Sequence, residues 1–69
     1  MTLEKAVEFA AQHLPERFTL SLVIEKDSGT LELFDVAEGF PIDLELAGFD
    51  LSQPLSEQIV DAVAYANNW

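Results

Sequence analysis

The sequence predicts a single α+β domain over residues 1–69, in which a helix, a three-stranded antiparallel β-meander and a second helix follow one another. Apolar residues recur at helical spacing near both ends of the chain and alternate with polar residues at strand spacing in between. The connections between the alternating segments are short, which favours an antiparallel meander. We expect both helices on one face of the sheet, because only one face is consistently apolar.

The first helix is expected from Thr2 to about Leu14. Thr2 is a suitable N-cap, and Pro15 ends the helix because the residue before a proline disfavours helical backbone. Phe9 lies off the apolar stripe, so we expect it to contact something other than the core. The stripe itself consists of Leu3, Ala6, Val7, Ala10 and Leu14.

The first two strands are expected over residues 17–26 and 30–36. Between them, Asp27-Ser28-Gly29 has the composition of a hairpin turn, with Gly29 supplying a positive φ. In the second strand Phe34 and Val36 face away from the core, which indicates a strand that is partly buried on both faces or contains a bulge. The inward side chains are Phe18, Leu20, Leu22, Ile24, Leu31 and Leu33.

The third strand is expected from Phe40 to Leu46, after a turn at residues 37–39, since this segment has the clearest alternation in the chain. Pro41 belongs at its start or on a sheet edge, because proline cannot donate to a strand ladder. The second helix begins at Pro54, with Ser52 or Gln53 as its cap. Its apolar stripe consists of Leu55, Ile59, Ala62, Ala66 and Trp69, flanked by Val63.

The charge of the chain is its most unusual property. Thirteen acidic residues face only Lys5, Arg17 and Lys26, which gives a formal net charge of −10. Such a surface repels nucleic acids and anionic membranes and attracts basic protein surfaces. The chain has no cysteine, no signal-peptide pattern and no apolar run near the roughly 20 residues that span a bilayer. We therefore expect a cytoplasmic protein that binds neither nucleic acid nor membrane directly.

The sequence offers little for catalysis, so we expect no enzymatic activity, no metal site and no cofactor. His13 is the only histidine, and it lies near the expected end of a helix. Acid–base chemistry between carboxyl groups needs a cleft that desolvates one of them, for which so small a domain has little room. The acidic residues do not match a calcium-loop pattern, and the three glycines are isolated from one another.

The outer face of the expected sheet carries a cluster of carboxylates. In the predicted register these residues point away from the helices, with Phe34 among them: Glu25, Glu32, Asp43 and Glu45 on the strands and Asp27 at the turn. Like charges across a sheet destabilise it, so their presence suggests a use in binding. The alternative is a solvated face that keeps edge strands from aggregating.

The function that these observations favour is a non-enzymatic inhibitor, which docks its carboxylate face on a basic surface of a partner protein, for example a nucleic-acid-binding surface. In size, charge and lack of catalytic groups the chain is similar to small acidic viral proteins that block restriction or CRISPR effectors, an analogy of composition. The alternative is a structural or assembly protein that forms a homodimer through exposed apolar and aromatic side chains. The residues expected at that interface are Phe9, Val60, Tyr65 and Trp69.

Overall fold

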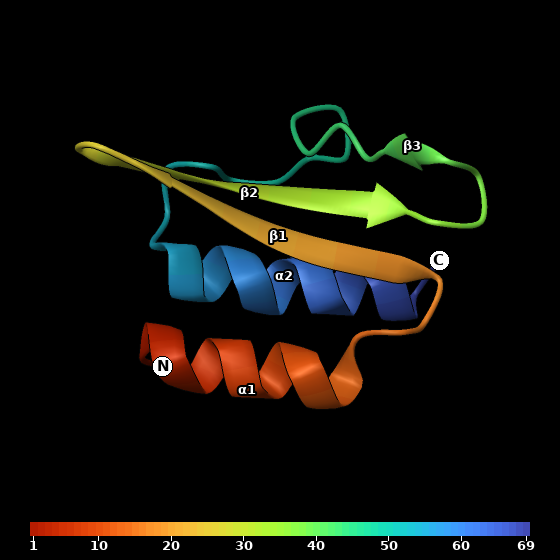
Figure 1. The fold of residues 1–69 in the computed structure, drawn as a ribbon, viewed down its shortest axis with the longest axis horizontal. Coiled ribbons are helices and arrows are strands. Elements are labelled where there is room, and N and C mark those ends of the chain that lie inside the picture. The colour runs from red at the N-terminus through yellow and green to blue at the C-terminus, as the bar shows by residue number, and fades with distance from the viewer.

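The computed structural model describes residues 1–69 and has the expected order of elements. Helix α1 (Leu3–His13) is followed by β1 (Phe18–Glu25), β2 (Ser28–Asp35), β3 (Phe40–Pro41) and helix α2 (Leu55–Asn67). The strands pair antiparallel in the order β1-β2-β3. Figure 1 shows both helices on the same side of the sheet, α2 next to the strands and α1 alongside α2. The predicted α+β meander is confirmed.

Helix α1 begins and ends where the sequence predicts, but its buried face is rotated. The Thr2 hydroxyl accepts a hydrogen bond from the Lys5 backbone N–H at 3.2 Å, as an N-cap should. Ala6 and Ala10 are buried, whereas Val7 is 51% exposed and Phe9 packs against the core. The expectation that Phe9 lies off the core is therefore wrong. The reason is that α1 packs mainly on α2, so its contact face is not the one chosen by counting apolar residues.

Strands β1 and β2 pair without interruption from Phe18 opposite Asp35 to Glu25 opposite Ser28. The second strand therefore contains no bulge. Its buried side chains alternate with exposed ones, so it is buried on one face only, and both predicted alternatives are wrong. Leu31 and Leu33 are buried beneath the sheet, while Phe34 on the outer face is 38% exposed.

The hairpin turn lies one residue earlier than predicted. Its two central residues are Lys26 and Asp27, and Asp27 adopts the positive φ of 66°, which aspartate tolerates better than most residues do. Gly29 instead belongs to β2. A Cβ atom at this position would lie 2.9 Å from Leu55 Cδ1, so the glycine makes room for the first turn of α2. The following turn has its positive φ at Gly39, within the expected residues.

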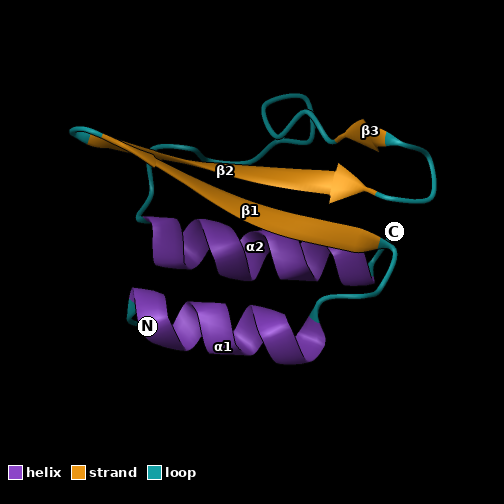
Figure 2. Cartoon of the chain, in the orientation of Figure 1, coloured by secondary structure: helices purple, strands orange, loops and turns teal.

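The third strand is much shorter than predicted, and the expectation of a strand to Leu46 is wrong. Beyond Pro41 one more backbone bond reaches β2, from Ile42 N–H to Leu33 C=O at 2.8 Å. The chain then leaves the sheet in the long connection that Figure 2 shows between β3 and α2.

A single capped helical turn replaces the missing part of the strand. The Asp43 carboxylate accepts from the Leu46 N–H at 3.2 Å, and the Ala47 N–H donates to the Asp43 carbonyl at 3.0 Å. Gly48, at φ 87°, ends the turn. Its N–H donates to Glu45 C=O and that of Phe49 to Leu44 C=O, the bonding pattern of a Schellman motif. An aspartate cap and a C-terminal glycine five residues apart thus override the alternation of apolar side chains.

Helix α2 begins directly after Pro54 without a side-chain cap, so the predicted caps Ser52 and Gln53 are wrong. The Ser52 backbone and hydroxyl instead donate to Asp50. The predicted stripe is otherwise confirmed at its centre, where Ile59, Ala62, Val63 and Ala66 are buried. Neither helix has the length and apolar character needed to cross a membrane.

Candidate binding groove at the open edge of β2

The shortened third strand leaves half of one edge of β2 without a partner. Val36 N–H donates toward β1, to Arg17 C=O, whereas Leu33 C=O accepts from the β3 side, from Ile42. Because alternate residues of a strand direct their backbone groups to opposite neighbours, Gly29 and Leu31 direct theirs to the β3 side. No backbone hydrogen bond from the 42–51 segment reaches either residue. Their N–H and C=O groups therefore form an open strand edge.

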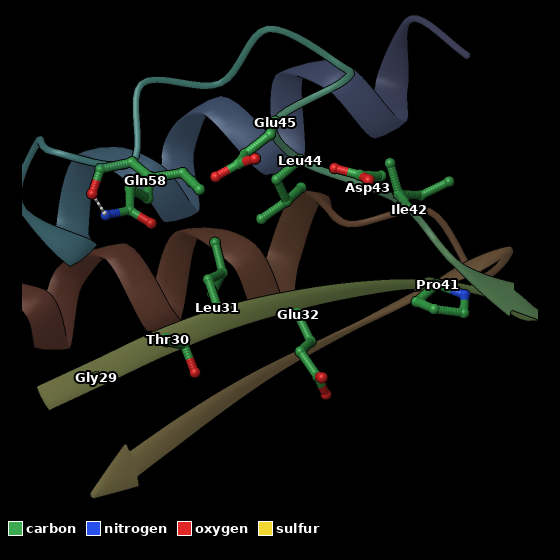
Figure 3. A pocket seen from close by; sticks show the side chains of 11 residues that line it. Gly29, Thr30, Leu31, Glu32, Pro41, Ile42, Asp43, Leu44, Glu45 and Gln58 are labelled. Atoms are coloured by element: carbon green, nitrogen blue, oxygen red, sulfur yellow. Dashed lines mark hydrogen bonds between the residues drawn. The ribbon is translucent and has the colours of Figure 1, made fainter.

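A groove of about 360 Å³ lies along this open edge. Figure 3 shows β2 on one side of it and the segment that follows β3 on the other. Residues 29–32 form the first wall and residues 41–45 the second, with Leu51 and Gln58 at one end. The apolar part of the lining includes Leu31 and Leu44, both only 8% exposed. The groove occupies the place that a full-length third strand would fill.

Three of the predicted carboxylates line this groove. Asp43 and Glu45 project from the second wall, and Glu32 projects from β2 on the outer side (Figure 3). All three are exposed, and none forms an ion pair, since the only cation in an ion pair is Arg17. An extended segment entering the groove would therefore lie beside the carboxylates of Asp43 and Glu45, with Glu32 at the outer rim of the first wall.

Gln58 adds a neutral acceptor at the end of the groove. Its side chain is held by two hydrogen bonds from Nε2, to the Gln53 carbonyl at 2.8 Å and to the Leu51 carbonyl at 3.2 Å. The residue is only 6% exposed, yet its side-chain oxygen accepts no hydrogen bond. No fully buried side-chain polar atom in the structure lacks a partner, so this oxygen is open to solvent. Figure 3 shows it turned away from the bonded nitrogen, on the side of the groove.

The remaining predicted binding residues lie elsewhere on the sheet. Glu25 is at the far end of β1, Asp27 is at the hairpin tip, and Phe34 lies on the outer face between Thr19 and Pro41. The expected face of four strand carboxylates is therefore wrong, because Asp43 and Glu45 have left the sheet with the chain. The structure brings Glu32, Asp43 and Glu45 to one groove and separates them from Glu25 and Asp27.

The residues expected at a homodimer interface are largely engaged within the chain. Phe9 contacts the His13 ring at a centroid distance of 4.7 Å. Tyr65 lies between Phe49 and Trp69, at 5.7 and 5.6 Å. Trp69 also contacts the Phe18 ring at 5.6 Å but remains 54% exposed, and Val60 is half-buried.

A second, apolar cleft of about 280 Å³ separates α1 from the inner side of β1. Eight of its nine lining residues are hydrophobic, with Ser21 as the exception. It is bounded by Val7 and Leu14 on one side and by Leu20 and Leu22 on the other. The fold thus leaves an apolar surface open at this cleft as well as at Trp69.

The sequence prediction missed an ion pair at the opposite end of the sheet. Arg17 Nη2 lies 2.9 Å from Asp35 Oδ2, and Arg17 Nε bonds both carboxylate oxygens. Asp35 is fully buried, and Oδ1 also accepts from the N–H groups of Ala37 and Glu38. The Arg17 guanidinium therefore holds the pKa of Asp35 below its usual range. The signal was present in the alternation, which places Asp35 on the inward side after Leu31 and Leu33.

The structure contains no group of three or more His, Asp or Glu side chains arranged to hold a metal ion. Comparison of the chain with protein-family models, with curated proteins and with solved structures gives no match. The groove and the negative charge are therefore the two features of the chain that bear on its function.

Proposed function

We propose that this chain is a non-enzymatic, cytoplasmic binding protein that docks the carboxylates of the β2 groove on a basic surface of a partner protein and thereby inhibits it. The observation that carries the proposal is the excess of unpaired acid. Of thirteen acidic residues only Asp35 and Glu38 are in ion pairs, both with Arg17. The other eleven have no cation of this chain against them, so an external cationic surface is their natural counterpart.

A nucleic-acid-binding site is one such surface, and the dimensions limit how the chain could occupy it. Duplex DNA carries one charge per about 1.7 Å of axis, so the longest extent of this chain, 32 Å, corresponds to about 19 phosphate charges. The thirteen acidic residues are fewer and are spread over several faces. The proposal is thus local complementarity to a lysine- or arginine-rich site, with imitation of only part of a nucleic-acid backbone.

Two variants of equal charge test the proposal. The groove variant neutralises the three groove carboxylates: Glu32→Gln, Asp43→Asn and Glu45→Gln. Asparagine is chosen at position 43 because it is also a good N-cap and preserves the turn. The control variant neutralises three exposed acids on or just after α1: Glu4→Gln, Glu8→Gln and Glu16→Gln.

The measurement is capture of proteins from a cell lysate by each tagged variant, washed at low and then at high salt. We expect the unmodified chain and the control variant to retain a basic protein at about 50 mM salt and to release it at about 500 mM, because salt screens exposed charges. The groove variant should retain none of it. Equal capture by both variants would remove the groove from the proposal.

The alternative function, a homo-oligomeric structural protein, is favoured by the apolar cleft between α1 and β1. A second copy covering this cleft would bury Val7, which is 51% exposed, and the neighbouring side chains. Such a dimer would persist or strengthen as salt rises, because burial of apolar surface is not screened. Sedimentation at low and high salt separates the two functions, since electrostatic docking weakens under the same change.

A further inference from the structure

We propose that the partner segment bound by the groove is an extended, basic stretch of polypeptide, which adds to the open edge of β2 as a replacement for the missing part of β3. This inference rests on the proposed function and specifies the ligand of that same site. The proposed ligand is a strand of alternating cationic and apolar side chains, whose backbone pairs with Gly29 and Leu31.

The open edge offers unpaired backbone groups to a ligand. Gly29 and Leu31 together present two N–H and two C=O groups on the β3 side, and none bonds to the 42–51 segment. Residues 29–32 of β2 are held in extended form by their ladder with β1. An incoming strand would therefore meet a preformed edge, the arrangement used in recognition by strand addition.

The residues that line the groove determine which ligand side chains fit it. Successive side chains of a strand point to opposite faces, so those of an added strand would alternate between the inner and outer sides of the sheet. On the inner side lie Leu31 and Leu44, which suit apolar side chains. On the outer side lies Glu32, and the second wall contributes Asp43 and Glu45. Lysine or arginine at every second position would place cationic side chains next to Glu32, and Asp43 and Glu45 add negative charge to the second wall.

Gln58 provides an independent indication of a donor-rich ligand. Its amide is fixed by two bonds from nitrogen, which leaves only its oxygen to face an incoming group. Every polar side chain that projects from the groove wall at positions 43, 45 and 58 thus offers an acceptor. Ammonium, guanidinium and backbone N–H groups are the donors that would satisfy them.

The test uses a synthetic peptide, acetyl-Lys-Val-Lys-Val-Lys-Val-amide, and isotope-labelled protein. We expect the amide signals of Gly29 and Leu31 to shift on titration and to gain protection from hydrogen exchange. The groove variant should bind at least about tenfold more weakly than the α1 control variant, because three charge contacts are lost. The same peptide with glutamate in place of lysine should not bind.

Two methylated peptides test the backbone pairing itself. Every second residue of a strand directs its backbone N–H group to the same edge. Methylating the backbone nitrogens of the three lysines, or those of the three valines, therefore blocks one edge only. We expect one methylated peptide to lose about tenfold or more in affinity and the other to bind as the parent does, since only one edge faces β2.

The outcomes separate this inference from the proposed function. Charge-dependent binding with equal effects of both methylations, and no change at Gly29 or Leu31, would overturn strand addition and leave electrostatic docking intact. Binding that is the same in the groove and control variants would overturn both. Protection of Gly29 and Leu31 that grows with protein concentration without peptide would show that a second copy fills the edge, and would also overturn the inference.

Discussion

At the scale of single residues, two carboxylates, Asp35 and Asp43, accept hydrogen bonds from backbone N–H groups and so have a structural role. Asp35 is enclosed by Arg17 and two backbone N–H groups, and it closes the end of the β1–β2 hairpin opposite its turn. Asp43 accepts from the Leu46 N–H and begins the turn that takes the chain out of the sheet. Both carboxylates therefore stabilise a particular backbone conformation, and Asp43 does so while it also lines the groove.

Replacing Asp35 by asparagine should lower the melting temperature at neutral pH and have progressively less effect in acid. The pKa of Asp35 is lowered in the folded chain by its hydrogen bonds with Arg17. Its contribution to stability is therefore fully present above the unfolded pKa, about 4, and is lost as pH falls through the folded value. Thermal unfolding of both proteins from about pH 7 to about pH 3 measures the difference. A difference that stayed constant over this range would contradict the role given to the ion pair.

Leu44 and Leu46 form a matched pair for testing the turn. Leu44 is 8% exposed and Leu46 is 88% exposed, although a continuous strand would place both on the same face. We expect Leu44→Ala to cost about 2–5 kcal/mol of unfolding free energy, as for other buried leucines, and Leu46→Ala to change it by less than about 0.5 kcal/mol. Urea unfolding measures the free energy lost in each variant. Similar losses at both positions would favour a continuous strand over the turn.

At the scale of elements, the spacing of apolar residues predicts the helices and strands correctly, except where local hydrogen bonds favour a turn instead of a strand. Both helices, the β1–β2 pairing and the core position of Ile59 follow from the spacing of apolar residues. The segment after Pro41 alternates equally well, yet Asp43 and Gly48 offer it a capped turn with its own hydrogen bonds. The rotation of α1 toward Phe9 could not be predicted, because it depends on which neighbour the helix packs against.

Only part of the groove could be predicted from the sequence, because the third strand ends at a turn that apolar spacing does not indicate. Glu32, Asp43 and Glu45 were identified as binding residues from charge and position, but as members of a continuous sheet face. The open edge at Gly29 and Leu31 follows only once the third strand is known to stop. Gln58 was missed because its amide lies among apolar neighbours of α2, where its bonds to residues 51 and 53 have no sequence signal.

Gly48 tests the local bonding that ends the strand early. Its φ of 87° lies in the left-handed region, and nothing lies within 4 Å of an added Cβ, so only backbone strain opposes substitution. We expect Gly48→Ala to cost about 1–2 kcal/mol and Gly48→Asn distinctly less, because asparagine tolerates this region. Chemical denaturation of the two variants provides the comparison. Equal stability of alanine and glycine at position 48 would mean that the turn does not need this conformation.

At the scale of the whole molecule, the most distinctive property of the chain is its net charge of −10. With Arg17 paired internally, Lys5 and Lys26 are the only other cationic side chains opposing the acids. The resulting self-repulsion weakens the compact state and also opposes association of two copies. A cationic partner relieves it, and so does salt.

We therefore expect the melting temperature to rise with salt concentration over the range in which exposed charges become screened, from about 20 mM to about 500 mM. Calorimetry in sodium chloride measures the rise. The groove and α1 variants, each three charges less negative, should show a smaller rise than the unmodified chain. A melting temperature that fell with salt would indicate that attractive surface pairs outweigh the repulsion.

Hydrogen exchange of the free protein measures whether the chain leaves half of the β2 edge open beside Glu32, Asp43 and Glu45. Thr30 and Glu32 direct their backbone groups to β1, whereas Gly29 and Leu31 direct theirs to the groove. We expect slow amide exchange at residues 30 and 32 and exchange at least about tenfold faster at residues 29 and 31. Uniformly slow exchange at all four, independent of protein concentration, would show that the third strand continues along β2 and that no edge is free to bind.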